Sequence, residues 1–378
     1  MSARFSVVIP TRNRQRYAVE AVRSILLAER ADVEIILCDN SDDPTALPRL
    51  LAEAGVAERV RLLESPGAHL SMRENWERAI AVLSGEWVAY IGDDDGVTPF
   101  AFTLADAVIA AFDVRVFSWI PSYYRWPCFP ASVAGMLEYN AFDFEIGFQT
   151  GAGALLDHQD WRTGGKWPAL GPSIYHAFVH RSVIEEVKAK HGEYFISFVV
   201  DYGAGVVNAQ IVDHFIVLNW PLSIMGACGR SNTAGLTGSG EAPQRIRDTR
   251  KENPDVAPFY PEFADSRLHA PWVIAGYRDI MARVGLPFGM TRDKFLASTL
   301  VELRTVREAE IFEAEKARLI AFRDAHGLRR AELDGLTLAP TAREMGAIKA
   351  PELRLRMDTR AFGWTGIYDV ASNIRALI

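Results

Sequence analysis

Three consecutive aspartates, Asp93, Asp94 and Asp95, stand between two glycines directly after the apolar run 87–91. The glycines allow a tight backbone turn, and alternation along an extended loop would point Asp93 and Asp95 to the same side. Such an Asp-x-Asp pattern could hold an anionic diphosphate through a divalent cation that both sides share. A calcium loop and a solvated acidic turn are the structural alternatives for the three residues taken alone.

Two further polar segments follow apolar runs in the same way. The run 5–9 ends at Pro10, Thr11 and Arg12, and the run 33–37 leads to Asp39. In open parallel sheets, ligands bind beyond the carboxyl ends of the strands, where the loops converge. One site could therefore collect these residues together with the three aspartates.

The elements that must position these residues alternate along the chain. Strands are expected at 5–9, 33–37, 60–63 and 87–91, and helices at 15–27, through Leu50 and Leu51, and at 71–83. Strands with helices between them imply a mostly parallel sheet that is covered on both faces.

The rest of the chain is less regular. We assign no regular structure to 119–167, strands to 173–179 and 215–225, and a helix to 183–190. The segment 226–261 is rich in Gly, Ser, Thr, Asn and Pro and is interpreted as a mobile loop or a lid. Residues 293–326 form a long amphipathic helical run with mixed charges.

Composition narrows the class of protein. The chain has 378 residues, 49% apolar and 24% charged, which is typical of a folded, water-soluble protein. Its net charge of -7 disfavours a general nucleic-acid binder. Cys38, Cys128 and Cys228 suggest neither a disulfide framework nor a zinc pair, and a reducing cytoplasm fits best. Without a signal peptide or a run of about 18 apolar residues, a cytoplasmic location is expected, and peripheral contact with the inner membrane stays open.

Three motifs carry a resemblance to a known family. Residues 7–13 (VVIPTRN), 35–43 (IILCDNSDD) and 90–96 (YIGDDDG) resemble, in order and spacing, the family-2 glycosyltransferases of GT-A fold. The resemblance covers about the first 100 residues strongly and the next 130 or so weakly, and it does not reach the C-terminal third. It implies an α/β, Rossmann-like sheet flanked by helices, with a helical C-terminal extension. The expected divisions are a nucleotide-sugar-binding half at 1–115, an acceptor-binding half at 116–260 and a helical region at 261–378.

The resemblance also implies roles for the polar residues. Asp39 would accept a hydrogen bond from uracil or another base, although Cys38 and Asn40 depart from the common Asp-Asp-Gly-Ser pattern and leave the base open. Asp93 would bind ribose, Asp95 would bind Mg²⁺ or Mn²⁺, and Asp94 would take either role or neither. The remaining implied contacts are Pro10, Thr11 and Arg12 around the base and Arg73 near the phosphates.

Each role has a structural alternative. Asp39 could be a turn or helix-cap residue, and Arg73 could pair with Glu77 one helical turn away. The segment 226–233, with Arg230 and Ser231, is a weak candidate for phosphate contact. The histidines His69, His176, His180 and His214 lack metal-ligand spacing and are interpreted as surface or packed residues.

Transfer of a sugar also needs a carboxylate that takes the proton from the attacking hydroxyl. Asp201 lies among apolar residues where related enzymes carry their acceptor-side acid, and burial could raise its pKa. It is the predicted catalytic base, and Asp157, Asp160 and Asp213 are its rivals.

The sequence thus predicts a metal-dependent, inverting glycosyltransferase. The expected donor is a nucleoside diphosphate sugar, with UDP favoured, and the acceptor is a glycan, a lipid-linked glycan or a protein in bacterial surface polysaccharide synthesis. A nucleotidyltransferase is the first alternative, but its Gly-rich loop after the first strand is absent. A non-catalytic carbohydrate-binding protein of the same fold is the second. A NAD-dependent dehydrogenase is excluded because no GxGxxG follows the first strand. Assembly into a homo-oligomer is favoured.

Overall fold

The computed structural model describes residues 3–129, 134–139, 145–161, 171–231, 250–306, 308–338 and 355–374. Residues 232–249, half of the segment predicted to be a mobile loop or a lid, lie outside the described residues.

An eight-stranded sheet forms the centre of the molecule, in the order β3-β2-β1-β4-β10-β6-β11-β9. Four of its seven neighbouring pairs are parallel, including the whole block from β3 to β4. Its strands are β1 (Phe5–Thr11), β2 (Val33–Asp39), β3 (Arg61–Leu63), β4 (Trp87–Tyr90), β6 (Val116–Trp119), β9 (Ile146–Thr150), β10 (Ala177–His180) and β11 (His214–Leu218).

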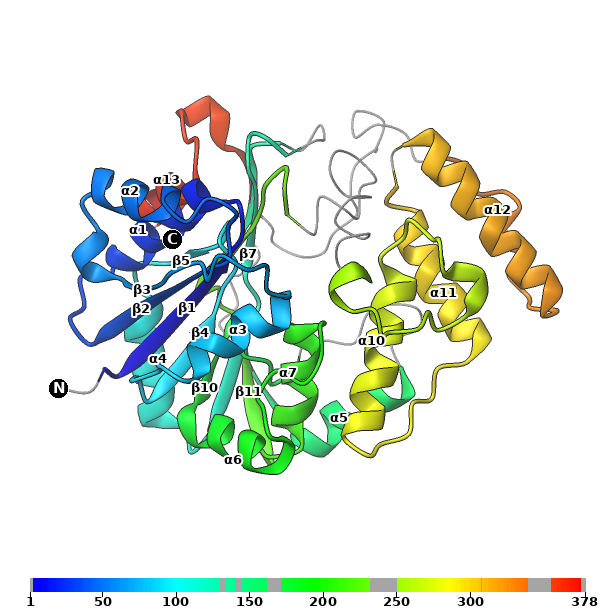
Figure 1. The fold of residues 1–378 in the computed structure, drawn as a ribbon, viewed down its shortest axis with the longest axis horizontal. Coiled ribbons are helices and arrows are strands. Elements are labelled where there is room, and N and C mark those ends of the chain that lie inside the picture. Colours follow the sequence, from blue (N-terminus) through cyan, green and yellow to red (C-terminus); the bar gives the residue numbers. More distant parts are fainter. Residues whose placement is uncertain are drawn as a thin grey trace.

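Helices cover both faces of this sheet (Figure 1), because alternate residues of each central strand point to opposite sides. Val7 and Ile9 of β1 pack in one core cluster with helices on their side, and Val8 packs in another. Every residue of β1 is buried, as expected for a central parallel strand. The covering helices are α1 (Gln15–Leu26), α2 (Ala46–Glu53) and α4 (Ala101–Ala111) on the first side, and α3 (Met72–Ile80), α6 (Arg181–His191) and α7 (Val200–Ala209) on the second.

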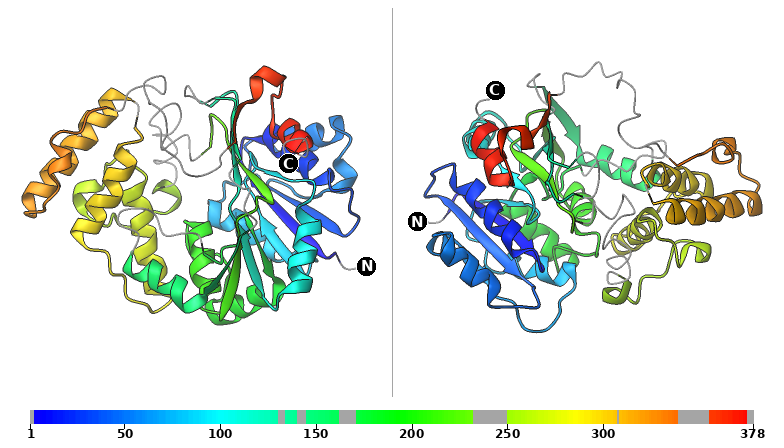
Figure 2. Two further views of the ribbon diagram at one scale, coloured as in Figure 1. Left: turned by 180° about the vertical axis from the view of Figure 1, so that it is seen from behind. Right: turned by 90° about the horizontal axis from the view of Figure 1, so that it is seen from above.

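A second sheet of five strands lies beside the first, in the order β13-β8-β7-β12-β5. Its strands are β5 (Gly96–Val97), β7 (Ser122–Arg125), β8 (Met136–Tyr139), β12 (Ser223–Ala227) and β13 (Leu355–Asp358). The following helix α13 (Ile367–Asn373) packs against α1. The last described segment, red in Figure 2, therefore returns to the N-terminal part of the molecule instead of staying with the preceding helices.

The remaining helices form a separate group on the right of Figure 1. These are α10 (Ala270–Arg283), α11 (Arg292–Leu303) and α12 (Ala309–Ala325), and α5 (Gly151–Asp160) lies at their base. The carboxylate of Glu302 accepts hydrogen bonds from the backbone amides of His269 and Ala270 at 2.7 and 2.6 Å, so it satisfies two amides at the start of α10. Burial raises the pKa of Glu302 to about 7.

Three expectations for the less regular part of the chain were wrong. The segment 119–167, to which no regular structure was assigned, contains β7, β8, β9 and α5, whose strands have only four or five residues and little alternation. The predicted strand 215–225 is two strands in different sheets, β11 and β12, which separate around Pro221. The helical run 293–326 is two helices, α11 and α12.

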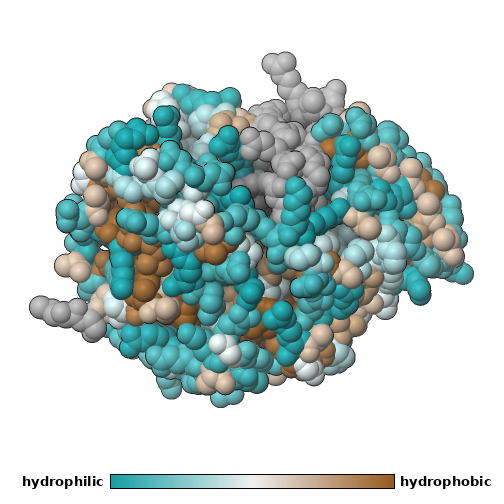
Figure 3. All heavy atoms as spheres, in the orientation of Figure 1, coloured by the Kyte–Doolittle hydropathy of each residue, from teal (hydrophilic) through white to brown (hydrophobic). Residues whose placement is uncertain are grey.

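None of the described helices combines the length and the apolar composition that crossing a membrane requires. On the face drawn in Figure 3, hydrophilic residues are spread over both the sheet part and the helical part of the molecule.

Candidate functional site

The polar residues that follow β1, β2 and β4 meet at one edge of the large sheet. Thr11 lies beside Asp39 in the parallel register of β1 and β2, and Pro10 lies beside Cys38. The Thr11 hydroxyl donates a hydrogen bond of 2.7 Å to Oδ2 of Asp93, which follows β4. The fold thus brings together residues that are 28 and 82 positions apart in the sequence.

Asp39 has one carboxylate oxygen engaged and one directed into buried space. Oδ1 accepts a hydrogen bond from the Ser41 amide at 2.9 Å. Oδ2 is buried without a hydrogen-bond partner among the described residues, although the residue is only 1% exposed. Burial raises the pKa of Asp39, and the hydrogen bonds of Ser41 offset part of that rise. A buried acceptor without a donor is unfavourable, so this oxygen suits the N–H group of a ligand.

The loop that carries Asp39 is held by side chains from α3. Nδ2 of Asn75 donates to the Cys38 carbonyl at 3.0 Å, and the Arg78 guanidinium donates to the Asp39 carbonyl at 3.1 Å. These contacts fix the backbone on either side of the carboxylate, so its orientation is set before any ligand arrives.

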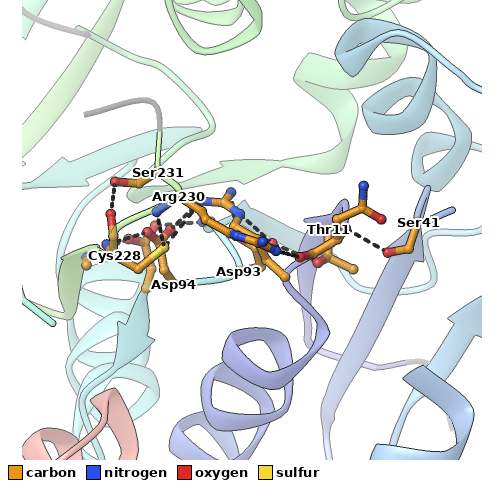
Figure 4. A network of polar contacts seen from close by, with 12 residues as sticks. Thr11, Ser41, Asp93, Asp94, Cys228, Arg230 and Ser231 are labelled. Carbon is orange, nitrogen blue, oxygen red and sulfur yellow. Dashed lines mark hydrogen bonds and ion pairs between the residues drawn. The ribbon is translucent and has the colours of Figure 1, made fainter. Parts of the chain in front are cut away.

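The acidic cluster, which is Asp93, Asp94 and Asp95, surrounds a buried arginine that the sequence analysis did not select. Nε of Arg14 donates to Asp93 Oδ2 at 3.0 Å, and Nη2 lies 2.5 Å from Asp93 Oδ1. Nη1 of the same group lies 3.4 Å from Asp94 Oδ1. Figure 4 shows Thr11, Asp93, Asp94 and Cys228 converging in this polar network.

The second sheet contributes backbone amides to the acidic cluster. The amide of Cys228 donates to Asp94 Oδ2 at 3.1 Å, and the indole N–H of Trp126 donates to the Asp94 carbonyl at 2.9 Å. The segment 226–233, considered for phosphate contact, therefore holds the aspartates through its first amides. The Arg230 side chain donates to the Asn13 carbonyl at 3.2 Å, and the Ser231 hydroxyl donates to the Cys228 carbonyl at 2.9 Å.

Asp95, the predicted metal ligand, is enclosed by donors. Its Oδ1 accepts from the Gly226 amide at 2.7 Å, and its Oδ2 accepts from the Gly92 amide at 2.6 Å and from the Tyr175 hydroxyl at 2.7 Å. Nε2 of His176 lies 3.3 Å from the same Oδ2, and Asp95 is 0% exposed.

This arrangement does not fit a metal ion at Asp95. Divalent cations such as Mg²⁺ keep several water or phosphate oxygens in their coordination shell, which requires access to the ligand. Within the described residues, no group of three or more His, Cys, Asp and Glu side chains is placed to hold a metal. Asp95 as a metal ligand stays a prediction that the geometry does not favour.

The Tyr175–His176 pair joins the acidic cluster to the second sheet. Nδ1 of His176 lies 2.7 Å from Oγ of Ser223, which also accepts from the Trp119 indole at 2.6 Å. His176 has a backbone φ of 52°, in the left-handed region that a residue with a side chain seldom adopts. His176, predicted to be a surface or packed residue, is packed at 2% exposed, and its ring contacts Asp95.

Asp201, the predicted base, lies in the first turn of α7 next to this pair. The Ser173 hydroxyl donates to the Asp201 carbonyl at 2.7 Å, which ties α7 to the segment that leads into Tyr175. The side chain is half-buried. Burial raises the pKa of Asp201, while backbone hydrogen bonds and the nearby His176 offset part of the rise.

The alternative candidates for the catalytic base, Asp157, Asp160 and Asp213, lie away from the acidic cluster. Asp213 precedes β11, which runs parallel to β6 and in the same direction as β1, so Asp213 lies at the opposite edge of the sheet from Asp39. The Gly151 amide at the start of α5 donates to the Asp213 carbonyl at 3.0 Å, which places the beginning of that helix at this far edge. Asp157 and Asp160 belong to the same helix, and Lys294 of α11 donates to the Asp160 carbonyl.

Two predicted phosphate or base contacts have acidic partners. Arg12 Nη1 donates to Glu252 at 3.1 Å and lies 3.1 Å from the His69 ring, which itself contacts Glu252 at 2.8 Å. Arg73 pairs with Glu193. The alternative partner for Arg73, Glu77, instead accepts hydrogen bonds from the backbone amides at 194 and 195.

Comparisons with known proteins relate part of the chain to one family. Residues 6–110 match the model of glycosyl transferase family 2. No curated protein is significantly similar in sequence to the chain. Among solved structures, S. aureus TarS residues 1–349 in complex with UDP-GlcNAc is 13% identical, with 86% of this chain and 92% of that chain covered and a TM-score of 0.46.

Two further solved structures are similar to a comparable degree. The same TarS fragment without a ligand named in its title is 13% identical over the same shares of the two chains, with a TM-score of 0.42. A mycobacterial protein is 18% identical, with 66% of this chain and 74% of that chain covered and a TM-score of 0.39. The match at residues 6–110 includes all three motifs, and it takes in β1 to β4 and the acidic cluster. These residues are a glycosyl transferase family 2 domain of GT-A fold, and the chain that carries them is a glycosyltransferase.

Proposed function

We propose that this glycosyltransferase moves a sugar, with inversion, from a nucleoside diphosphate donor whose base is uracil. The observation that carries the proposal is the buried Oδ2 of Asp39, an acceptor without a described partner at the edge where β1, β2 and β4 end. The family domain and the position at the carboxyl ends of parallel strands support a nucleotide pocket at this edge.

The hydrogen-bonding properties of the Asp39 carboxylate indicate which nucleobase it can bind. An ionised carboxylate accepts hydrogen bonds and donates none. Uracil presents an N–H at its N3 position, whereas cytosine presents a lone pair there. Asp39 therefore favours uracil over cytosine, because cytosine would leave two acceptors facing each other.

The other residues predicted to contact the nucleotide-sugar are proposed to surround Asp39. Pro10 and Thr11 continue β1 beside it, and Asp93 is held by Thr11 on the ribose side of the proposed pocket. Asp94 has the most exposed side chain of the acidic cluster, at 6%, and is proposed to face the donor. Arg12 and Arg73 would reach the donor after exchanging their present partners Glu252 and Glu193.

Asp201 is the proposed catalytic base. Its carboxylate would take the proton from the acceptor hydroxyl as that oxygen forms a bond to the anomeric carbon of the sugar. The bond from the anomeric carbon to the donor phosphate oxygen breaks in the same step, and the nucleoside diphosphate leaves with the electron pair. Attack from the face opposite the leaving group gives inversion. A carboxylate with a raised pKa is a stronger base than an exposed one, which suits this role.

We also propose an acceptor, a cellular setting and an assembly state for this enzyme. The acceptor is a glycan, a lipid-linked glycan or a protein, and the setting is bacterial surface polysaccharide synthesis in the cytoplasm or at the inner membrane. Homo-oligomer formation is part of the same proposal. Dependence on Mg²⁺ or Mn²⁺, which the sequence predicts, is not part of this proposal, and no step above uses a metal because Asp95 does not fit one.

The test is a change of base preference in Asp39→Asn. The Ser41 amide, which donates to Oδ1, would hold the asparagine oxygen in that place, so the NH2 group would take the place of Oδ2. A donor would then face uracil N3–H, and the same donor would match the lone pair at N3 of cytosine. Loss of a hydrogen bond to a charged group costs about 1.5–3 kcal/mol, so we expect UDP affinity to fall about 10- to 150-fold while CDP affinity rises. Isothermal titration calorimetry with UDP and CDP measures both.

Asp43→Asn is the matched control, because Asp43 lies four residues further along the same loop, is exposed and accepts hydrogen bonds from Thr45 within that loop. It should bind UDP as the natural protein does. Equal UDP affinity in the Asp39→Asn protein and the natural protein would remove Asp39 from the pocket.

A further inference from the structure

The charge balance of the acidic cluster depends on Arg14. The cluster gathers three carboxylates, and the residues are 0%, 4% and 0% exposed for Asp93, Asp94 and Asp95. Carboxylates buried this deeply require cations or strong hydrogen-bond donors nearby. Arg14 is the guanidinium that contacts two of the three, and its own side chain is 14% exposed.

The contact with Asp93 combines a hydrogen bond with a close ion-pair contact. Nε donates to Oδ2 at 3.0 Å, and Nη2 lies 2.5 Å from Oδ1 without hydrogen-bond geometry, so one guanidinium faces both oxygens of the carboxylate. A planar guanidinium makes this contact and an ammonium does not. Burial alone would lower the pKa of Arg14, but the fields of Asp93 and Asp94 outweigh it and raise the pKa, so the group is always charged.

The contact with Asp94 is looser and leaves hydrogen-bonding capacity. Nη1 lies 3.4 Å from Asp94 Oδ1 and donates to the sulfur of Cys228 at 4.0 Å, and both distances are long. Because these contacts are long, Nη1 can donate to a closer acceptor beside Asp94, the most exposed of the three aspartates. A phosphate oxygen is the natural partner for such a group.

A divalent cation at the same place would compete with Arg14. It would have to bind Asp93 or Asp94 within a few ångströms of a fixed positive charge that already holds the oxygens of Asp93. Asp95, the third carboxylate, is enclosed by its own donors. The acidic cluster is thus built around a cation that the chain itself supplies.

We propose that Arg14 is a positioning residue that takes the place of a divalent cation in the acidic cluster, so that this chain binds its nucleoside diphosphate donor without a metal. Arg14 fixes Asp93 through Nε and Nη2 and offers Nη1 to the diphosphate. The part that concerns the donor rests on the proposed function, and the part that concerns the cluster does not.

The cluster is tested with Mn²⁺ alone, without any nucleotide. Isothermal titration calorimetry compares the natural protein with Arg14→Met, and with Arg16→Met as the matched control because Arg16 is an exposed arginine at the start of α1, two residues after Arg14. We expect Arg14→Met to bind Mn²⁺ at least about tenfold tighter than the natural protein, since removal of the guanidinium frees oxygen ligands of the kind that such cations prefer. Arg16→Met should equal the natural protein.

The double variant Arg14→Met/Asp93→Asn should lose the gain in Mn²⁺ affinity. If Arg14→Met does not fold in EDTA, its recovery in Mn²⁺ gives the same support, and failure to recover counts against the proposal. Mn²⁺ affinity in Arg14→Met no higher than in the natural protein would overturn it.

Metal-independent binding of the donor is tested with the natural protein, so the result does not depend on whether a variant folds. UDP affinity measured in EDTA and in Mn²⁺ should agree within about twofold, and a tenfold gain from Mn²⁺ would overturn the proposal. Absence of UDP binding under both conditions would count against the proposed function instead, while the Mn²⁺ comparison of Arg14→Met would still decide the role of Arg14.

Discussion

The Asp201→Asn protein is expected to retain its affinity for UDP within about twofold and to lose about 10²- to 10⁴-fold in kcat for sugar transfer, the range of a single general base. The amide has nearly the same shape as the carboxylate, so α7 and the Ser173 contact to the Asp201 backbone stay in place. It cannot take a proton from the acceptor hydroxyl. Release of UDP from a UDP-sugar in the presence of an acceptor measures the rate, and calorimetry measures the affinity.

The pH profile gives the same experiment a second readout. The base must be ionised to act, and burial raises its pKa above the ordinary value for aspartate. Activity should therefore fall as pH decreases through that raised pKa, at a higher pH than an exposed aspartate would give. The Asp201→Asn protein should lack this fall in its residual rate.

Asp213→Asn serves as the control, because Asp213 lies at the far edge of the sheet and should leave the rate unchanged. An Asp201→Asn protein with the rate of the natural protein would assign the base to another residue.

Replacement of Gly226 by alanine should disrupt the acidic cluster. A Cβ atom at Gly226 would lie 1.7 Å from the carbonyl oxygen of Asp94 and 3.0 Å from Nε1 of Trp126. Neither neighbour is the end of a flexible side chain, so β12 would have to move away from the cluster. That movement would remove the amide donors of Gly226 and Cys228 from Asp95 and Asp94.

We expect Gly226→Ala to lower the free energy of unfolding by roughly 1–3 kcal/mol or more, as overpacking does, and to weaken UDP binding. Urea unfolding and calorimetry measure the two effects. Gly147→Ala, on the edge strand β9, is the control, because the atom nearest to its Cβ would be the Val217 carbonyl oxygen of β11, 3.6 Å away. If both variants behaved alike, the close approach of β12 to the acidic cluster would have no functional role.

The sequence predicted the first half of the large sheet well because its strands are buried on both faces. Such strands appear as continuous apolar runs; β1 and β2 end at Thr11 and Asp39 of the site, and Asp93 follows three residues after the end of β4. The middle of the chain was not predictable in this way. Its strands have only four or five residues, too few for an alternation to stand out, and β9 is exposed along its whole length, so it gives no buried apolar run.

Part of the site followed from the topology, since parallel strands end at the same edge. The partners of the acidic cluster did not. Gly226 and Tyr175 contact Asp95 from positions 131 and 80 residues away, and no local pattern records such contacts. The role of Arg14 could have been predicted from the sequence. Three adjacent aspartates require a cation once they are buried, and Arg14 follows the strand that ends at Thr11.

The burial of Asp95 changes how the motif is understood. The spacing alone makes Asp93 and Asp95 equivalent, but the fold gives Asp95 four contacts within the protein and gives Asp94 the most exposed side chain. Asp95 thus organises the turn after β4, and the donor is expected to approach from the side of Asp94 and Arg14.

A crystal structure of the protein with UDP bound would test the central claim most directly. We predict that N3 of uracil lies at hydrogen-bonding distance, about 2.7–3.2 Å, from Oδ2 of Asp39, and that the diphosphate extends toward Asp94 and Nη1 of Arg14. Uracil bound away from Asp39, or a diphosphate that extends away from the acidic cluster, would contradict the account.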